Sequence, residues 1–407
     1  MRTPSWARLA GTGFSGATSL SIGVVRFDDE TALAGGWASF NGEPAFRIRS
    51  LGDLDTSKAW ILDIGYPAYM AGQLYTVAHL RRMDFLRVKP KALLAELSVS
   101  SNPDEQLRIL SGIYGKTVDI LAAKHGFDPS TAEITAAHAL REAWPSQRPS
   151  INPSLDDELA EAMLESTQES QKASGRSPAG SVSHVGCFPR SAFAAYLLSQ
   201  PLPTQGSWSQ VKIHGGSKTI GVHKGQAIRG SEEWLTKTSA LAETSAIYLR
   251  VSVLSMPATY ARYCAFGAGA NHQRRWATLP EILHLAKFCK LEIGSGFRVD
   301  AASADYEPSD IDPTISGGIA AEIEWVARSL PSTRGQGSAV GAYLRAYDRI
   351  ACAKAAANVI NAGYTVGSYG TGRVYVYAGK HDRTVADAML GSGLLPSPTK
   401  KKSGVQQ

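Results

Sequence analysis

The stretch SLSIGVVRFDDET, residues 19–31, sets the first expectation about the fold. Its first part is rich in β-branched residues and predicts a strand, which runs into an acidic turn. The next segment, GGWASFNGEPAFRIRSL (35–51), holds Asn41-Gly42 between two strand-like runs, and Asn-Gly is a strong hairpin signal. The chain is therefore expected to open with a small antiparallel sheet.

Helical patterns dominate from residue 57 onward. The segment 57–88, SKAWILDIGYPAYMAGQLYTVAHLRRMDFLRV, carries apolar residues at helical spacing. NPDEQLRILSGIYGKTVDILAAKHGF (102–127) predicts a helix that begins after a cap at Asn102 and ends at Gly126. SEEWLTKTSALAETSAIYLRVSVL (231–254) is also expected to be helical.

Later in the chain, 338–363 predicts a long helix, whereas two glycine-containing segments predict hairpins at 208–222 and 362–379. These patterns predict a fold that is mainly α with small antiparallel β-hairpins, two-lobed and helix-rich. A chain of 407 residues is expected to form two lobes. The expected organisation is a flexible N-terminal arm at 1–18, an N-terminal lobe at 19–180 with an acidic linker at 151–180, a C-terminal helical lobe with hairpins at 181–395, and a disordered basic tail at 396–407.

Basic residues concentrate in one part of the chain. The net charge is +6, yet 207–299 alone holds twelve cations against five anions. In TYARYCAFGAGANHQRRW (259–276), aromatic residues alternate with the cations, which suits phosphate contacts and base stacking. The alternative is a solvated face whose aromatic side chains are buried in the core. The residues predicted to bind RNA are Lys212, Lys218, Lys224, Arg229, Arg262, Arg274, Arg275, Lys287 and Lys290.

The sequence carries no strong enzyme signature. GTGFSG (11–16) matches the dinucleotide fingerprint, but the strand before it and the helix after it are not predicted. His214 and His223 could approach each other across two strands as a metal pair, although no third ligand is visible. We therefore expect no catalytic residue, no metal and no cofactor. The sequence contains no run of 18 apolar residues, so no membrane span is predicted.

FDDET (27–31) resembles the first acidic motif of exonucleases with an RNase H-like core. The resemblance implies that Asp28, Asp29 and Glu30 hold two metal ions for phosphodiester cleavage. His138 and Glu142, at i and i+4 in TAAHALREAW, are the partners that such a site would use. The His-to-Asp spacing of that family is absent, so an acidic turn between strands is the preferred interpretation.

The segment 259–275 also resembles the central motif of nucleoproteins of nonsegmented negative-strand RNA viruses, in which a Tyr-bearing helix enters a small-residue turn. AEIEWVARSL (321–330) followed by AYLRAYDRIACAKAA (342–356) is similar in order to the rhabdovirus-like pattern. The hairpins depart from that pattern and leave open a coat protein of another RNA virus. The matched residues are Tyr260, Ala265, Gly267, Glu324, Trp325 and Tyr343.

This resemblance implies a non-enzymatic viral nucleocapsid or coat protein that encapsidates genomic RNA. Its expected partners are single-stranded RNA, bound through the phosphate backbone, and further copies of itself in large homo-oligomers. Its expected location is the virion and the host cytoplasm. The alternative is a metal-dependent nuclease that uses the FDDET carboxylates.

Overall fold

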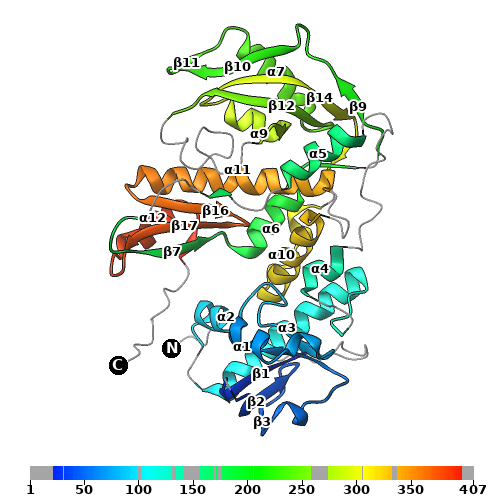
Figure 1. The fold of residues 1–407 in the computed structure, drawn as a ribbon, viewed down its shortest axis with the longest axis vertical. Helices are drawn as coiled ribbons and strands as arrows, with labels where there is room; N and C mark the ends of the chain where they lie inside the picture. Colours follow the sequence, from blue (N-terminus) through cyan, green and yellow to red (C-terminus); the bar gives the residue numbers. More distant parts are fainter. Residues whose placement is uncertain are drawn as a thin grey trace. The chain divides into compact units, whose positions relative to one another are not determined.

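A computed structural model describes residues 22–30, 32–99, 102–130, 134–141, 156–167, 171–172, 177–204, 206–257, 274–304, 306–331 and 337–396. The described chain forms two compact units, one within 1–143 and 312–327 and the other within 144–311 and 328–407. Each unit contains a five-stranded or larger sheet together with helices, so the fold is mixed α/β (Figure 1). The prediction of a mainly α, helix-rich fold is therefore wrong.

The first unit is built on a five-stranded sheet with the order β3-β2-β1-β4-β5. Strand β1 is central; it pairs antiparallel with β2 and parallel with β4, and β4 in turn pairs parallel with β5. The predicted opening strand and the hairpin at Asn41-Gly42 are confirmed by the β1, β2 and β3 pairings. The strands are β1 (Ile22–Asp29), β2 (Ala34–Phe40), β3 (Phe46–Ile48), β4 (Ala59–Leu62) and β5 (Leu80–Arg81).

Helix α3 packs on strands β1 and β2 of this sheet, where Ser39 and Ser111 share a 2.8 Å hydrogen bond between their hydroxyls. The helix begins after Asn102, whose side chain accepts from the Asp104 amide, and ends at the left-handed Gly126, as predicted. Helix α10 joins the same unit late in the sequence through a 2.8 Å ion pair between Lys124 and Glu324. The helices are α1 (Tyr66–Ala71), α2 (Pro90–Leu97), α3 (Pro103–His125), α4 (Ala136–Leu140) and α10 (Ile315–Ser329), with short 3-10 turns at Leu51–Asp53 and Leu74–Thr76.

The second unit contains a six-stranded sheet whose strands follow the order β11-β10-β14-β12-β13, with β9 also paired to β14. Helices α7 and α9 pack on it, and its core includes Ile220, Leu249, Ile282 and Leu291. Figure 1 shows β10 and β11 beside α7. These elements are β9 (Ser209–Val211), β10 (Ser217–His223), β11 (Gln226–Ala227), α7 (Ser231–Leu241), β12 (Ala246–Ser255), β13 (Trp276–Thr278), α9 (Leu279–Leu285) and β14 (Lys290–Val299).

A second sheet of this unit has the order β18-β7-β17-β16-β6, and the long helix α11 packs against it (Figure 1). Asp348 of α11, fully buried, accepts hydrogen bonds at 2.7 Å from the amides of Thr371 and Gly372 in the β16–β17 turn. The predicted hairpin at 362–379 is thus confirmed. The remaining elements are α5 (Asp156–Ser166), β6 (Gln171–Lys172), β7 (Ser181–Cys187), α6 (Arg190–Leu198), β8 (Leu202–Pro203), β15 (Ala302–Ser303), a 3-10 turn (Pro308–Asp310), α11 (Ala339–Asn361), β16 (Thr365–Gly370), β17 (Arg373–Gly379), α12 (Thr384–Gly391) and β18 (Leu395–Pro396).

Three local predictions differ from the structure. The start of 57–88 is strand β4, because a strand buried on both faces carries a continuous apolar run that helical spacing also fits. The segment 231–254 divides into helix α7 and strand β12. The expected hairpin at 208–222 does not form, since β9 and β10 both pair with β14 rather than with each other.

The division into units also differs from the expected lobes. Residues 144–180 belong to the second unit, whereas 312–327 return to the first. The predicted N-terminal arm at 1–18 and most of the tail at 396–407 lie outside the described residues. Among the helices that the structure describes, none combines the length and apolar character needed to cross a membrane.

Candidate functional site

Charged residues gather where the parallel strands β1 and β4 end. Ligands of open sheets that contain parallel strands bind beyond the carboxyl ends of those strands. The register pairs Val25 with Leu62, so the next residues, Arg26 and Asp63, are neighbours across the two strands. Asp28 follows two residues later on β1. The sheet therefore gathers an arginine and two carboxylates at one edge.

An arginine neutralises the buried carboxylate of this edge. Asp63 is 2% exposed, and its Oδ2 accepts from Arg26 Nε at 2.9 Å and forms an ion pair with Arg26 Nη2 at 2.8 Å. Arg26 Nη1 also donates to Gln106 Oε1 of helix α3 at 2.5 Å. The guanidinium is thus held between a strand and a helix, with Asp63 as its counter-charge.

The three FDDET side chains are also engaged. Asp28 forms a 2.8 Å ion pair with Arg47 of β3, in which both side chains are about half exposed. Asp29 accepts from a backbone amide in the following turn at 3.0 Å, and Glu30 lies 3.0 Å from the Lys91 ammonium. These contacts are those of an acidic turn that ties β1 to neighbouring elements.

The residues at this edge do not fit a two-metal site. Two-metal phosphodiester chemistry places its cations about 3.5–4 Å apart, held by ligands that face both of them. Within the described residues, no group of three or more His, Cys, Asp or Glu side chains is arranged to hold a metal ion. Arg26 takes the position beside Asp63 that a cation would need. We therefore derive no metal-dependent step for this edge.

The histidines considered as metal or catalytic partners lie elsewhere. His138 contacts the Thr135 hydroxyl at 2.8 Å through Nδ1 at the start of α4. Glu142, its expected partner, lies outside the described residues. His214 and His223 are both exposed and belong to no metal-ligand group in the described chain.

Four of the predicted RNA-binding residues form an exposed set at one edge of the six-stranded sheet. Lys212 follows β9, Lys218 lies on β10, Lys224 lies in the β10–β11 turn, and Arg229 follows β11. We call these four residues the basic edge. All four are exposed, and none forms an ion pair with another described residue. The sequence from 209 to 230 contains no acidic residue; the fold brings Glu292 of β14 opposite Thr219 of β10, and the charge of Lys218 acts on Glu233 of α7.

The other five predicted RNA-binding residues are dispersed. Lys287 is exposed after α9, and Lys290 is half-buried at the start of β14. Arg262 lies outside the described residues. Arg274 is 4% exposed, which removes it from the surface, and Arg275 is exposed but paired with carboxylates of α5. The predicted basic lip around 274–275 is therefore corrected, because Glu281 pairs with Arg274 seven residues away, and Glu161 and Glu165, more than 100 residues earlier, pair with Arg275.

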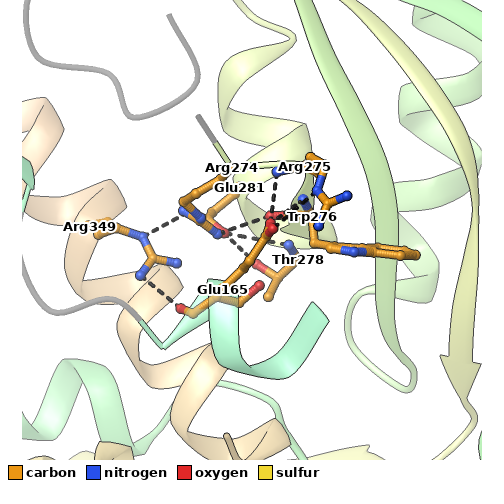
Figure 2. A network of polar contacts seen from close by, with 8 residues as sticks. Glu165, Arg274, Arg275, Trp276, Thr278, Glu281 and Arg349 are labelled. Atoms are coloured by element: carbon orange, nitrogen blue, oxygen red, sulfur yellow. Dashed lines mark hydrogen bonds and ion pairs between the residues drawn. The ribbon is translucent and has the colours of Figure 1, made fainter. Parts of the chain in front are cut away.

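Arg274 belongs to a buried ionic cluster of the second unit, which Figure 2 shows from close by. Its Nη1 and Nη2 donate to the two oxygens of Glu281 at 2.8 and 3.0 Å. On the other side, Arg349 Nε donates to Glu281 Oε1 at 2.9 Å, and its Nη1 donates to the Ser166 carbonyl at 2.9 Å. The cluster therefore joins α9, α11 and the end of α5 around one carboxylate.

Glu281 stays ionised in this interior. Burial would raise its pKa, but the charges of Arg274 and Arg349 lower it further and hold it well below its usual value of 4.5. Glu281 also completes a capping box with Thr278 at the start of α9. The sequence signal for this residue is that Thr-x-x-Glu pattern, whereas nothing in the sequence marks Arg349 as its partner.

His284 lies one turn after Glu281 and should make the second unit less stable at acidic pH. Burial lowers its pKa from 6.5 to about 4, and the charges of Lys354 and Lys287 act in the same direction. The unfolded chain then binds the proton more tightly, so the free energy of unfolding should fall by up to about 3 kcal/mol as the pH drops from 6.5 to 4.

We expect His284→Gln to flatten that pH dependence in urea titrations between pH 7 and 4. The matched control is His223→Gln, because His223 is exposed and should leave the curve unchanged. An equal slope in the His284→Gln variant and the unaltered chain would contradict the assignment.

No protein-family model matches the sequence, and no curated protein matches it. Solved structures similar to the chain include those of Phi29 DNA polymerase. Its orthorhombic crystal form aligns with a TM-score of 0.44 and 11% identity over 90% of this chain and 81% of the polymerase. The complex with single-stranded DNA aligns with a TM-score of 0.43 and 11% identity over 90% and 82%. The primer-template complex gives a TM-score of 0.40 at the same identity and coverage.

The mixed α/β fold corrects two predictions. The coat-protein interpretation required a mainly helical fold, whereas both units are built on sheets. The expectation of a non-enzymatic chain came from that coat-protein interpretation and is withdrawn with it. At these TM-scores and identities, the likeness assigns no family and no activity to this chain.

Proposed function

We propose that this chain binds nucleic acid through the phosphate backbone, at the basic edge of its second unit, as a protein that processes nucleic acid. The observation that carries the proposal is the local charge of that edge. Lys212, Lys218, Lys224 and Arg229 are exposed in a segment with no acidic residue. Clustered Lys and Arg side chains gain affinity for nucleic acid by releasing the counterions of its phosphates.

The acid at the start of α7 is mainly engaged by a cation of its own helix. Glu233 lies 2.7 Å from the Lys237 ammonium, which lowers its pKa most, and the charge of Lys218 on the basic edge lowers it as well. Trp208 and Trp234, the aromatic residues of this region, are buried and half-buried. Phosphate contact rather than base stacking is therefore the expected mode, with little dependence on base sequence.

Salt dependence tests this proposal. Four phosphate contacts give a slope of log K against log salt of about −3.6 on duplex DNA and about −2.8 on a single strand. We expect Lys212→Gln, Lys218→Gln and Lys224→Gln together to reduce that slope by about 2 to 3 units. The measurement is fluorescence anisotropy with labelled 20-nucleotide single-stranded DNA, RNA of the same sequence and duplex DNA between 50 and 200 mM salt.

The matched control removes the same charge elsewhere in the second unit. Lys354→Gln, Lys380→Gln and Arg383→Gln alter three exposed cations outside the basic edge. A slope that falls equally in both triple variants would show that net charge alone drives binding. An unaltered chain that binds none of the probes at 50 mM salt would exclude the function itself.

Phosphodiester cleavage by the first unit is a second candidate, favoured by one observation. The parallel β1–β4 pair brings Asp28 of the FDDET motif and Asp63 to the ends of neighbouring strands. The pairing of Asp63 with Arg26 opposes it. Incubating labelled strands with Mg²⁺ or Mn²⁺ decides the question: cleavage lost in Asp28→Ala supports this candidate, and no cleavage with either metal removes it.

A further inference from the structure

Helix α5 places a row of carboxylates against two exposed arginines of the second unit. Glu158, Glu161 and Glu165 are spaced by three and four residues, so they lie along one face of the helix. The arginines are Arg250 on β12 and Arg275 just before β13. The described part of α5 carries no cation. This row therefore balances positive charge at the β12–β13 edge of the six-stranded sheet.

Three ion pairs make the contact. Glu158 Oε1 lies 2.7 Å from Arg250 Nη2, and both side chains are 54% exposed. Glu161 pairs with Arg275 Nη2, and Glu165 Oε1 lies 3.4 Å from Arg275 Nε, while the Arg275 side chain is still 67% exposed. Exposed pairs of this kind contribute little to stability and weaken with salt. Both arginines can therefore exchange their carboxylate for another anion without unfolding the unit.

The helix itself is fixed by contacts that do not involve these pairs. Leu159 and Ala162 are fully buried, and α5 packs against α11 and β13. Glu165 Oε2 accepts from the backbone amides of Arg275 and Trp276 at 2.8 and 3.1 Å, which covers the outer edge of β13 (Figure 2). The acidic row thus remains beside Arg250 and Arg275 whether or not their side chains stay paired.

We infer that Arg250 and Arg275 form a second phosphate-contacting surface and that the acidic row of α5 competes with nucleic acid for it. This inference rests on the proposed nucleic-acid function. The chemistry is the exchange of a carboxylate for a phosphate oxygen at a guanidinium, which binds both in the same planar geometry. Arg250 also lies 5.1 Å from the centre of the Trp276 ring, which holds its side chain over the sheet edge.

The test neutralises the two exposed acids and leaves Glu165 in place. We expect Glu158→Gln with Glu161→Gln to raise the affinity for 20-nucleotide single-stranded DNA at least about tenfold at 50 mM salt. Two new phosphate contacts should steepen the salt slope by about 1.4 units. Adding Arg250→Gln and Arg275→Gln to that variant should abolish the gain. Thermal melts followed by circular dichroism confirm that each variant is folded.

The matched control is Glu243→Gln with Asp387→Asn, which raises the net charge equally at exposed positions outside α5. An equal gain in the control, or no gain in the α5 variant of a chain that binds DNA, would overturn the competition. Failure of the unaltered chain and of every variant to bind would instead overturn the proposed function. If only the α5 variant binds DNA, the acidic row of α5 prevents binding by the unaltered chain, which supports the competition.

Discussion

Replacing Glu281 by Gln should lower the free energy of unfolding of the second unit by about 3 to 5 kcal/mol. The side chain keeps its size but loses the charge that balances Arg274 and Arg349, both 4% exposed. Two buried guanidinium groups would then face each other without a counter-charge. Because such a charge cannot be hydrated in the interior, its cost is far larger than the value of any surface ion pair. Urea unfolding at pH 7 measures the loss.

The Glu281 carboxylate also makes the free energy of unfolding depend on pH. The pKa of Glu281 is lower in the folded chain than its usual 4.5, so its contribution is present above pH 4.5 and is lost as the pH falls below that value. The matched control is Glu233→Gln, which breaks an exposed 2.7 Å pair with Lys237 and should change the free energy of unfolding little. Equal losses in the two variants would show that Glu281 is not the counter-charge of the cluster.

The parts of the fold that follow from neighbouring residues could be predicted. Asn102 and Gly126 bound helix α3 because a side-chain cap and a left-handed glycine act within one turn. The β16–β17 hairpin follows from Gly370 and Gly372, which both have positive φ angles in the turn. Strand β1 also stands out, since Ile22, Val24 and Val25 lie within four positions of the sequence.

The parts that depend on pairing partners could not be predicted. AWIL of β4 is buried on both sides, and a short apolar run of this kind fits a helix or a parallel strand equally well. The parallel β1–β4 pair decides between them, and this pair joins residues more than 30 positions apart. The fold class differs from the predicted one for the same reason, because the segments of β4 and β12 fit helical spacing but form strands.

The charged residues of the candidate site show the same contrast between what neighbouring residues determine and what distant partners determine. Counting cations along 207–299 correctly locates the exposed residues of the basic edge, since no acid lies near them in the sequence. The count fails at Arg274 and Arg275, whose partners include Glu281, seven residues later, and Glu165, 110 residues earlier. A count of cations along the sequence therefore does not show which of them the folded chain pairs with a carboxylate.

Replacing Arg26 by Met should destabilise the first unit by about 3 to 5 kcal/mol, because it leaves the buried Asp63 without its cation. Met keeps much of the apolar volume of the arginine stem, so the loss reports on charge rather than on packing. Both unfolding transitions should be recorded in urea, since the two units need not unfold together. The control is Arg47→Met, which removes the exposed partner of Asp28 and should cost less than about 1 kcal/mol.

A second variant separates the ion pair from its surroundings. In Arg26→Met with Asp63→Leu, the charge and its partner are both gone, and most of the lost stability should return, as happens when a buried pair is replaced by apolar residues. No recovery in this double variant would show that the edge of β1 and β4 depends on the shape of Arg26 and its 2.5 Å hydrogen bond to Gln106. Recovery would show that the charge of Arg26 is what allows Asp63 to be buried. Arg26 would then hold the position that a metal ion would occupy beside this carboxylate.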